Sequence, residues 1–156
     1  MEQAFYKDGT LKRETYKLNG KLHREGGPAV RHFDHVGRLD REEFRVNGKL
    51  HREGGPAIIW YKSGEILRRE YKQFGHLHRI GGPAIEGFYS NGNKHFTSYY
   101  MKGKLSRDDG PADETFYDDG VCRSYEWAGP ARSTRAGQPV EAYFTRDGKK
   151  YSEFFK

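Results

Sequence analysis

The sequence contains one cysteine, Cys122, and no long run of apolar residues. A single cysteine has no partner for an intramolecular disulfide, and it excludes a metal site built from several cysteines. The longest apolar run, at residues 57–61, is far shorter than the roughly 20 residues that a membrane-spanning helix requires. The opening residues, MEQAFYKDGT, lack the basic and then apolar pattern of a signal peptide. We therefore expect a cytoplasmic protein that does not enter a membrane.

Large apolar side chains are also scarce, because Leu, Ile, Val and Phe together account for 28 of the 156 residues. A fraction below roughly 20% is typical of disordered chains, but those chains also carry a high net charge. Here the net charge is only +6, and aromatic residues make up 15% of the chain. Each aromatic side chain can bury roughly 150–250 Å². We therefore expect a folded protein with an aromatic core, and the 20 glycines favour a thin layer over a thick globule.

A repeat of about 28 residues organises the chain. The motif LHREGGPA begins at Leu22 and Leu50, and it recurs as LHRIGGPA at Leu77 and LSRDDGPA at Leu105. Six turn glycines follow the same period: Gly9, Gly37, Gly64, Gly92, Gly120 and Gly148. A first aromatic column lies four residues before these glycines: Phe5, Phe33, Trp60, Phe88, Phe116 and Phe144. A second column lies seven residues after them: Tyr16, Phe44, Tyr71, Tyr99, Trp127 and Phe155.

These columns predict one repeat domain over residues 1–156, with repeats at 1–28, 29–56, 57–83, 84–111, 112–139 and 140–156. The stretch 133–140 is a degenerate copy of the motif in the same register. Pairs such as Asp8-Gly9 and Asn19-Gly20 predict two-residue hairpin turns, which need positive φ. Residues 39–46 are expected to form one strand and residues 49–52 a short third strand of the same repeat. No segment shows the apolar spacing of a helix, so we predict little or no helix.

The expected architecture is an all-β antiparallel meander built from repeats, either a β-solenoid or an elongated twisted sheet. One repeat cannot bury its own face, so equivalent residues of successive repeats should line up and pack. The strands at the two ends would be open to another copy of the chain, which allows homo-oligomers.

The phrase Asn-Gly-Lys-Leu-His-Arg-Glu-Gly-Gly-Pro-Ala at residues 47–57, preceded by an aromatic residue four positions before a glycine, resembles the MORN-variant repeat family. Members are hairpin arrays found as bacterial antitoxin-like proteins and in phage and giant-virus genomes. The resemblance extends from Phe5 to Phe155. It implies a non-catalytic interaction scaffold in a bacterial or virus-infected cell, acting as an antitoxin-like or virus-encoded inhibitor of a partner protein.

Arginine and histidine recur at fixed repeat positions and are the first candidates for partner binding. The arginine column is Arg24, Arg52, Arg79, Arg107 and Arg135, and the histidine column is His23, His51 and His78. Each arginine can donate to carbonyls of its glycine-rich turn and stack on an aromatic ring, or it can belong to a row of cations that binds a polyanion or an acidic protein. Equivalent histidines would lie roughly 10–14 Å apart, too far to share a metal ion. We therefore expect neither a metal site nor a cofactor.

Charge is unevenly distributed along the chain. Residues 1–85 contain 17 Lys and Arg against 11 Asp and Glu, whereas residues 86–156 contain 11 of each. Further partner-binding candidates in the basic part are Arg41, Arg45, Arg68 and Arg69, which alternate with aromatic residues as in proteins that bind single-stranded nucleic acid. Acidic residues mixed among them, as in Arg41-Glu42-Glu43, favour instead a solvated face of alternating charge.

No catalytic constellation is evident from the sequence. Cys122 has no histidine at its own repeat position, and no glycine-rich loop leads into a helix. We expect a non-enzymatic module that binds another macromolecule, with a protein as the first candidate partner. A basic nucleic-acid-binding protein and a self-associating structural protein remain as alternatives.

Overall fold

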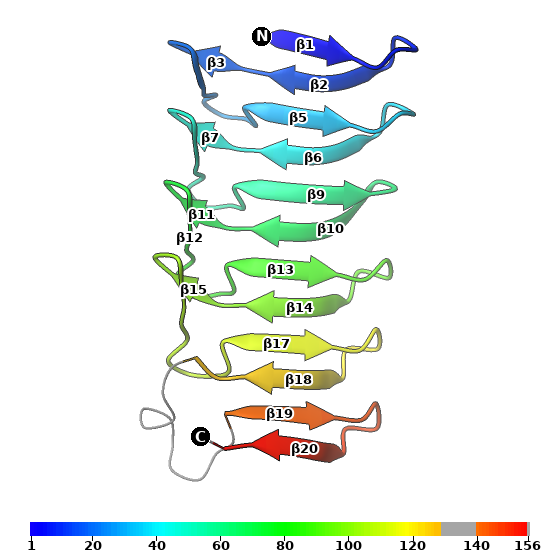
Figure 1. Cartoon of the computed structure of the whole chain (residues 1–156), viewed down its shortest axis with the longest axis vertical. Helices are drawn as coiled ribbons and strands as arrows, with labels where there is room; N and C mark the ends of the chain where they lie inside the picture. The colour runs from blue at the N-terminus through cyan, green and yellow to red at the C-terminus, as the bar shows by residue number, and fades with distance from the viewer. Residues whose placement is uncertain (129–139, 156) are drawn as a thin grey trace. The chain divides into compact units, whose positions relative to one another are not determined.

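The computed structural model describes residues 1–128 and 140–155, and every regular element in them is a β-strand. The strands pair antiparallel with their neighbours along the chain, so the predicted all-β meander is confirmed. Contacts divide the chain into two compact units, Met1–Leu77 and His78–Lys156, which we call unit 1 and unit 2. Each long hairpin of unit 1, and the first long hairpin of unit 2, is followed by a short hairpin (Figure 1).

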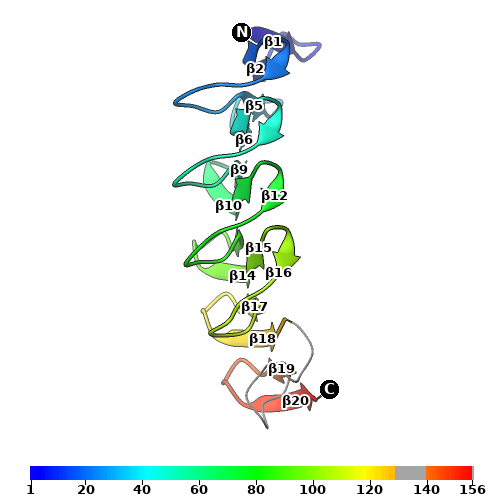
Figure 2. The ribbon, with the colours of Figure 1, turned by 90° about the vertical axis from the view of Figure 1, so that its left-hand side faces the viewer.

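Unit 1 contains six long strands that pair in the order β1-β2-β5-β6-β9-β10. Their bounds are β1 Glu2–Phe5, β2 Leu11–Thr15, β5 Val30–Phe33, β6 Leu39–Glu43, β9 Ile58–Lys62 and β10 Glu65–Glu70. Three short hairpins follow the long ones: β3 Lys17–Leu18 with β4 Lys21–Leu22, β7 Arg45–Val46 with β8 Lys49–Leu50, and β11 Lys72–Gln73 with β12 His76–Leu77. Figure 2 views the molecule from the side of these short hairpins.

Unit 2 repeats this plan with the order β13-β14-β17-β18-β19-β20. Its long strands are β13 Ile85–Phe88, β14 Lys94–Ser98, β17 Asp113–Phe116, β18 Cys122–Glu126, β19 Glu141–Phe144 and β20 Lys150–Phe154. One short hairpin is described, β15 Tyr100–Met101 with β16 Lys104–Leu105. Arg135 and most of the degenerate motif copy at 133–140 lie outside the described residues. Val140 is described. Its backbone N–H donates to the Phe154 carbonyl, just as the backbone N–H of Ala112 donates to the Glu126 carbonyl.

Each of the first four repeats contains four strands, not the three predicted. Residues 39–46 do not form one strand, because β6 ends at Glu43 and β7 begins at Arg45. The intervening Phe44 donates its backbone N–H to the carbonyl of Ala57 in the following repeat, at 2.8 Å. This bond diverts the chain from the long hairpin into the short one.

Two kinds of turn close the hairpins. The short hairpins use the predicted two-residue turn, as at Asn19 and Gly20, where φ is 50° and 74°. The long hairpin at Asp8-Gly9 differs from the prediction, because the Gly9 N–H donates to the Tyr6 carbonyl and the Tyr6 N–H to the Thr10 carbonyl. This geometry is a three-residue loop with glycine in the left-handed region, and the register of the two strands shifts by one residue between Ala4 and Phe5.

The third repeat corrects the first aromatic column. Its long hairpin turns through Ser63 and Gly64 with only two residues, which accounts for a repeat one residue shorter. Strand pairing aligns Trp60 with His32, because both pair with Arg41. Tyr61, and not Trp60, therefore occupies the position of Phe33. A shift of one residue moves a side chain to the opposite face of a sheet, so Trp60 lies on the other face from the aromatic column.

The interior is made of small aliphatic residues and not of the expected aromatic core. Ala29, Ala57, Ala84 and Ala112 are fully buried, whereas 56% of the Phe5 surface is exposed. Each of these alanines follows a Gly-Pro or Asp-Gly-Pro turn, and Ala29 links two repeats by accepting from Tyr16 and donating to Glu43. Val140 takes the place of these alanines in the sixth repeat: its carbonyl accepts from Trp127 as that of Ala29 accepts from Tyr16, and it is also buried.

Candidate binding surface

The arginine column stabilises the loops that join successive repeats. The guanidinium carbon of Arg24 lies 3.8 Å from the Tyr16 ring centroid, and its Nη1 donates to the Pro28 carbonyl at 3.4 Å. Arg52 makes the same two contacts with Phe44 and Pro56. In unit 2, Arg107 stacks on Tyr99 and donates to Pro111, and Arg79 donates to Pro83. These contacts agree with the first of the two interpretations given above, in which each arginine donates to a carbonyl of its glycine-rich turn and stacks on an aromatic ring.

The second glycine of each Gly-Gly-Pro motif makes room for this arginine. A Cβ atom at Gly27 would lie 3.2 Å from the Arg24 guanidinium carbon, and one at Gly55 would lie 3.0 Å from that of Arg52. Both distances are tighter than ordinary van der Waals contact. The motif thus encodes a guanidinium held between an aromatic ring and bare backbone.

The histidine column links successive repeats by hydrogen bonds. His23 Nδ1 accepts from the backbone N–H of Asn47, and His78 Nδ1 accepts from that of Lys102, both at 3.2 Å. His51 differs, because its ring stacks on Phe74 with a centroid distance of 4.2 Å. Within residues 1–128 and 140–155, no group of three or more His, Cys, Asp or Glu side chains could hold a metal ion.

A row of alternating cations and rings crosses the strands of unit 1. We call it the cation–ring row, and it consists of Arg13, His32, Arg41, Trp60 and Arg68. Strand pairing places each of these residues directly beside the next one. Because neighbouring strands are roughly 4.7–4.9 Å apart, arginines on every second strand recur at roughly 9.5 Å. The Arg68 guanidinium carbon lies 5.3 Å from the Trp60 ring centroid.

Two buried carboxylates hold the arginines of this row. Glu43 is only 7% exposed, and its oxygens lie 2.8 Å from Arg41 Nη2 and 2.7 Å from Arg45 Nε. Glu70 is equally buried and pairs with Arg68 at 2.6 Å and Lys72 at 3.0 Å. Two cations share one carboxylate in the second and third repeats, so one positive charge remains in excess at each carboxylate; in the first repeat Thr15 stands at the position of Glu43. The expected solvated face of alternating charge is therefore wrong for Glu43, because its pairing and register turn it inward.

His32 is neutral in this row. Burial lowers the pKa of His32 below its usual 6.5, and the neighbouring Arg41 lowers it further, although Glu43 acts in the opposite direction. Arg41 Nη2 lies 2.9 Å from His32 Nε2 and must be the donor, since a guanidinium has no acceptor. His32 Nε2 is therefore unprotonated, and the ring carries its hydrogen on Nδ1.

The remaining predicted residue of the basic part, Arg69, is not in the row. It pairs across the hairpin with Ile59, one residue out of phase with the row, and so lies on the opposite face. On that face Arg31 lies 3.3 Å from Glu42 and 3.8 Å from Glu14. Tyr61 donates to Glu42 there, and burial together with this bond raises the pKa of Tyr61 to about 12.

The same row positions are uncharged in unit 2. Pairing of β13, β14, β17, β18, β19 and β20 places there, in order, Gly87, Phe96, Thr115, Ser124, Tyr143 and Ser152. The charge counts from the sequence indicated that the first part of the chain is basic, but they did not show that cations gather on one face of the sheet. The strand register shows that the excess charge of unit 1 includes a single row across its strands.

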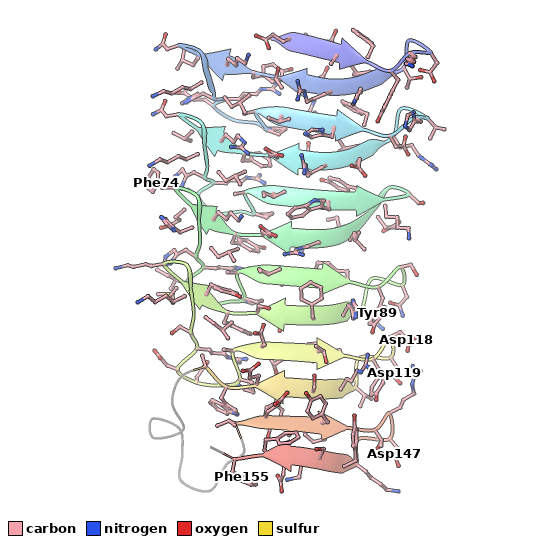
Figure 3. All side chains as sticks on the ribbon, viewed as in Figure 1. Phe74, Tyr89, Asp118, Asp119, Asp147 and Phe155 are labelled. Atoms are coloured by element: carbon pink, nitrogen blue, oxygen red, sulfur yellow. The ribbon has the colours of Figure 1, made fainter. Side chains whose placement is uncertain are left out.

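Tyrosine hydroxyls connect successive repeats, which sequence analysis missed. Tyr6 Oη donates to the Phe33 carbonyl at 2.8 Å, and Tyr89 Oη donates to the Phe116 carbonyl at 2.8 Å. Tyr117 Oη bonds to the Phe144 carbonyl in the same way, at 3.0 Å. The signal was present, since a tyrosine follows the first aromatic column in the first, fourth and fifth repeats. Figure 3 shows Tyr89 beside the long-hairpin turns.

Two hollows in unit 1 adjoin these cations. One, of about 330 Å³, is lined by Arg13, His32 and Arg41 of the row together with Leu22 and Val30. The other, of about 570 Å³, lies between two Gly-Gly-Pro loops and is lined by residues that include Arg45 and Phe74. Arg45 thus connects the second hollow with Glu43, the carboxylate that also holds Arg41 of the row.

Comparisons with protein-family models, curated proteins and solved structures found no match to this chain. None of the elements in the described part of the chain is a helix able to span a bilayer.

Proposed function

We propose that this protein is a non-catalytic binding module whose unit 1 engages an acidic surface of another protein. The cation–ring row supports this proposal most directly. Arginine and tryptophan are the residues most enriched at the energetic centres of protein interfaces. Because Glu43 and Glu70 already hold Arg41 and Arg68, little side-chain entropy is lost when a partner binds.

A protein partner fits the charge of the row better than a nucleic acid does. In the second and third repeats a buried carboxylate neutralises one of the two cations that it holds, which leaves an excess of one positive charge over roughly 9.5 Å. Nucleic-acid binding draws its affinity from neutralising many closely spaced phosphates. A protein surface with sparse carboxylates is the closer complement.

The resemblance to MORN-variant repeats favours an inhibitor of the antitoxin-like or virus-encoded kind, which would occupy the working surface of its partner. A lack of catalysis is consistent with Cys122, since burial raises the pKa of its thiol and so disfavours the reactive thiolate. The same family resemblance leads us to propose that the protein is cytoplasmic.

Site-specific photo-crosslinking in the cells that encode the protein tests this function. A benzophenone side chain replaces Trp60 in the row or, as a control, Tyr143 at the same repeat position in unit 2. We expect one discrete adduct from position 60 that resists nuclease and is digested by protease. The adduct should weaken when Arg13 is changed to Glu and persist when the exposed Arg123 of unit 2 is changed to Glu.

Other outcomes contradict the proposal. A nuclease-sensitive adduct at position 60 would favour the nucleic-acid alternative. An adduct formed between two copies of the chain would favour self-association. Equal labelling from positions 60 and 143 would remove the row as the binding surface.

A further inference from the structure

Phe74 occupies an unfavourable position at the tip of a short hairpin (Figure 3). It is the first residue of the two-residue turn between β11 and β12, with φ of 47°, and 57% of its surface is exposed. Asn19 and Asn47 stand at this turn position in the two preceding repeats, each with φ of 50°. Asparagine tolerates the left-handed region, whereas a bulky side chain is strained there. Phe74 therefore reduces stability through its backbone, and more than half of its apolar surface remains in water.

Phe74 also removes a hydrogen bond that the neighbouring repeats make. His23 Nδ1 accepts from Asn47, but the ring of His51 instead stacks on Phe74 at an interplanar angle of 12°. His51 Nδ1 is buried and has no hydrogen-bond partner among the residues that the structure describes. Strain, exposed apolar surface and a lost hydrogen bond thus coincide at one residue. Such local costs are characteristic of functional positions.

The hollow beside Phe74 combines positive charge with apolar walls. Its volume of about 570 Å³ lies within the range of ligand pockets. Its lining includes three arginines and three apolar side chains: Arg24, Arg45, Arg52, Phe44, Val46 and Phe74. Glu25 and Glu53 also line it, and the Glu53 side chain is 90% exposed.

The arginines of the hollow retain capacity for a carboxylate. The loop bonds described above use one N–H group each of Arg24 and Arg52, whereas a guanidinium has five. Both guanidinium carbons lie 3.8 Å from the centroid of an aromatic ring, a contact that restricts the movement of the group before a ligand arrives. A planar donor group held in this way suits a carboxylate.

The equivalent hollow of unit 2 has a different character. It measures about 510 Å³ and is lined by Asp108 and Asp109, with Asp109 at 2.9 Å from Arg107 Nε. Lys102 occupies the corresponding turn position in the fourth repeat, but it does not line this hollow. Here Arg107 already has an acidic partner within the hollow.

We propose that Phe74 and its hollow form the anchor for the protein partner, taking a segment in which an apolar side chain adjoins a carboxylate. The apolar side chain packs on Phe74 and Val46, and the carboxylate pairs with Arg24 or Arg52. This inference rests on the proposed protein-binding function. It adds the chemistry of the bound segment and names the residue that anchors this segment.

Changing Phe74 to Asn separates binding from stability. The change relieves the backbone strain and restores the turn residue of the first two repeats, so we expect Tm to rise by about 2–4 °C. The same change should weaken binding at least about tenfold, because an exposed aromatic anchor is lost. Phe74→Trp retains a ring and should keep affinity within about threefold. Lys102→Asn in unit 2 is the matched control, with a similar gain in Tm and unchanged binding.

The binding probe is the acetylated peptide amide Glu-Trp-Glu-Leu, titrated by NMR beside its counterpart Lys-Trp-Lys-Leu. We expect the acidic peptide to shift the signals of Phe74 and His51, and the basic peptide to leave them in place. Equal shifts with both peptides would overturn the charge requirement. Unchanged affinity in Phe74→Asn, or a loss of Tm together with affinity, would overturn the anchor, the latter by making Phe74 a structural residue.

The two proposals fail in distinguishable ways. If a protein is crosslinked at position 60 and binds Phe74→Asn as tightly as the unaltered chain, the proposed function stands and the anchor is wrong. If no protein is crosslinked at position 60, the function itself is contradicted, whatever the peptide does.

Discussion

Units 1 and 2 share their backbone plan but differ in the side chains displayed on it. Both repeat the buried alanine, the stacked arginine and the glycine beside it, as at Ala57 and Ala112. At the row positions, however, unit 1 presents arginines where unit 2 presents residues such as Phe96 and Ser124. The residues that build the repeat and the residues that vary between units therefore occupy separate positions.

Net charge follows the same division. Residues 1–77 contain 16 Lys and Arg against 11 Asp and Glu, and residues 78–156 contain 12 against 11. Acidic residues are equally frequent in both units, so the difference lies in the added cations. Arg13, Arg41 and Arg68 of the row account for three of them.

The largest expected effect concerns binding. Replacing Arg13, Arg41 and Arg68 together by Gln should lower the affinity for the partner captured at position 60 by roughly 100-fold or more. Fluorescence anisotropy measures this affinity. Three exposed cations of unit 2, Lys94, Arg123 and Lys150, serve as the control when changed to Gln. Their replacement should alter affinity by less than about twofold. Equal losses in the two triple variants would mean that net charge, and not the row, governs binding.

Glu43→Gln is expected to destabilise the protein by about 2–3 kcal/mol, because two guanidiniums lose a buried anionic partner. Glu126→Gln changes the same repeat position in unit 2, where the carboxylate is exposed, and should cost less than about 0.5 kcal/mol. Urea unfolding at pH 7 measures both. Similar losses would show that Glu43 contributes no more than a surface carboxylate does.

Gly87→Ala tests the side-chain packing at the corresponding row positions of unit 2. An added Cβ would lie 2.1 Å from the Phe96 ring, which occupies the position of an arginine in unit 1. The ring must move, so we expect a loss of about 1–3 kcal/mol by thermal unfolding. Combining the change with Phe96→Leu should recover part of the loss. No recovery would place the strain in the backbone and not against the ring.

The smallest expected effect is the pH dependence contributed by His32. Because burial lowers the pKa of His32 in the folded state, its contribution to stability is complete above its ordinary value of 6.5. As pH falls, the unfolded chain takes up the proton first, and stability declines until the folded pKa is passed. In His32→Gln this part of the decline between pH 7 and 5 should disappear in urea titrations. An unchanged pH profile would show that the pKa of His32 is the same in the folded and unfolded states.

The repeat period allowed most of the fold to be predicted from the sequence, because period and turn residues are local properties. The strand pairing of Trp60 was not predictable in this way. Because Trp60 and Tyr61 are both aromatic, the sequence does not show which of the two occupies the column position when the following turn is one residue shorter. Only the pairing with Arg41 resolved the ambiguity.

The candidate surface was predicted only in part. Arg41, Arg45 and Arg68 were identified from charge, but Arg13 and Trp60 gained their roles from cross-strand register, which links residues far apart in sequence. The burial of Glu43 depends on two cations that approach from different strands. The significance of Phe74 depends on its φ angle, which composition does not specify.

The shortened turn at Ser63 and Gly64 has a consequence for how such a chain can change. The third repeat lost a residue there, yet Ile58 and Glu70 still pair just as Val30 and Glu43 do one repeat earlier. A length change at this end of a hairpin leaves the strands on either side in phase. Loops of foreign sequence could therefore be grafted at these tips without turning any buried side chain toward solvent.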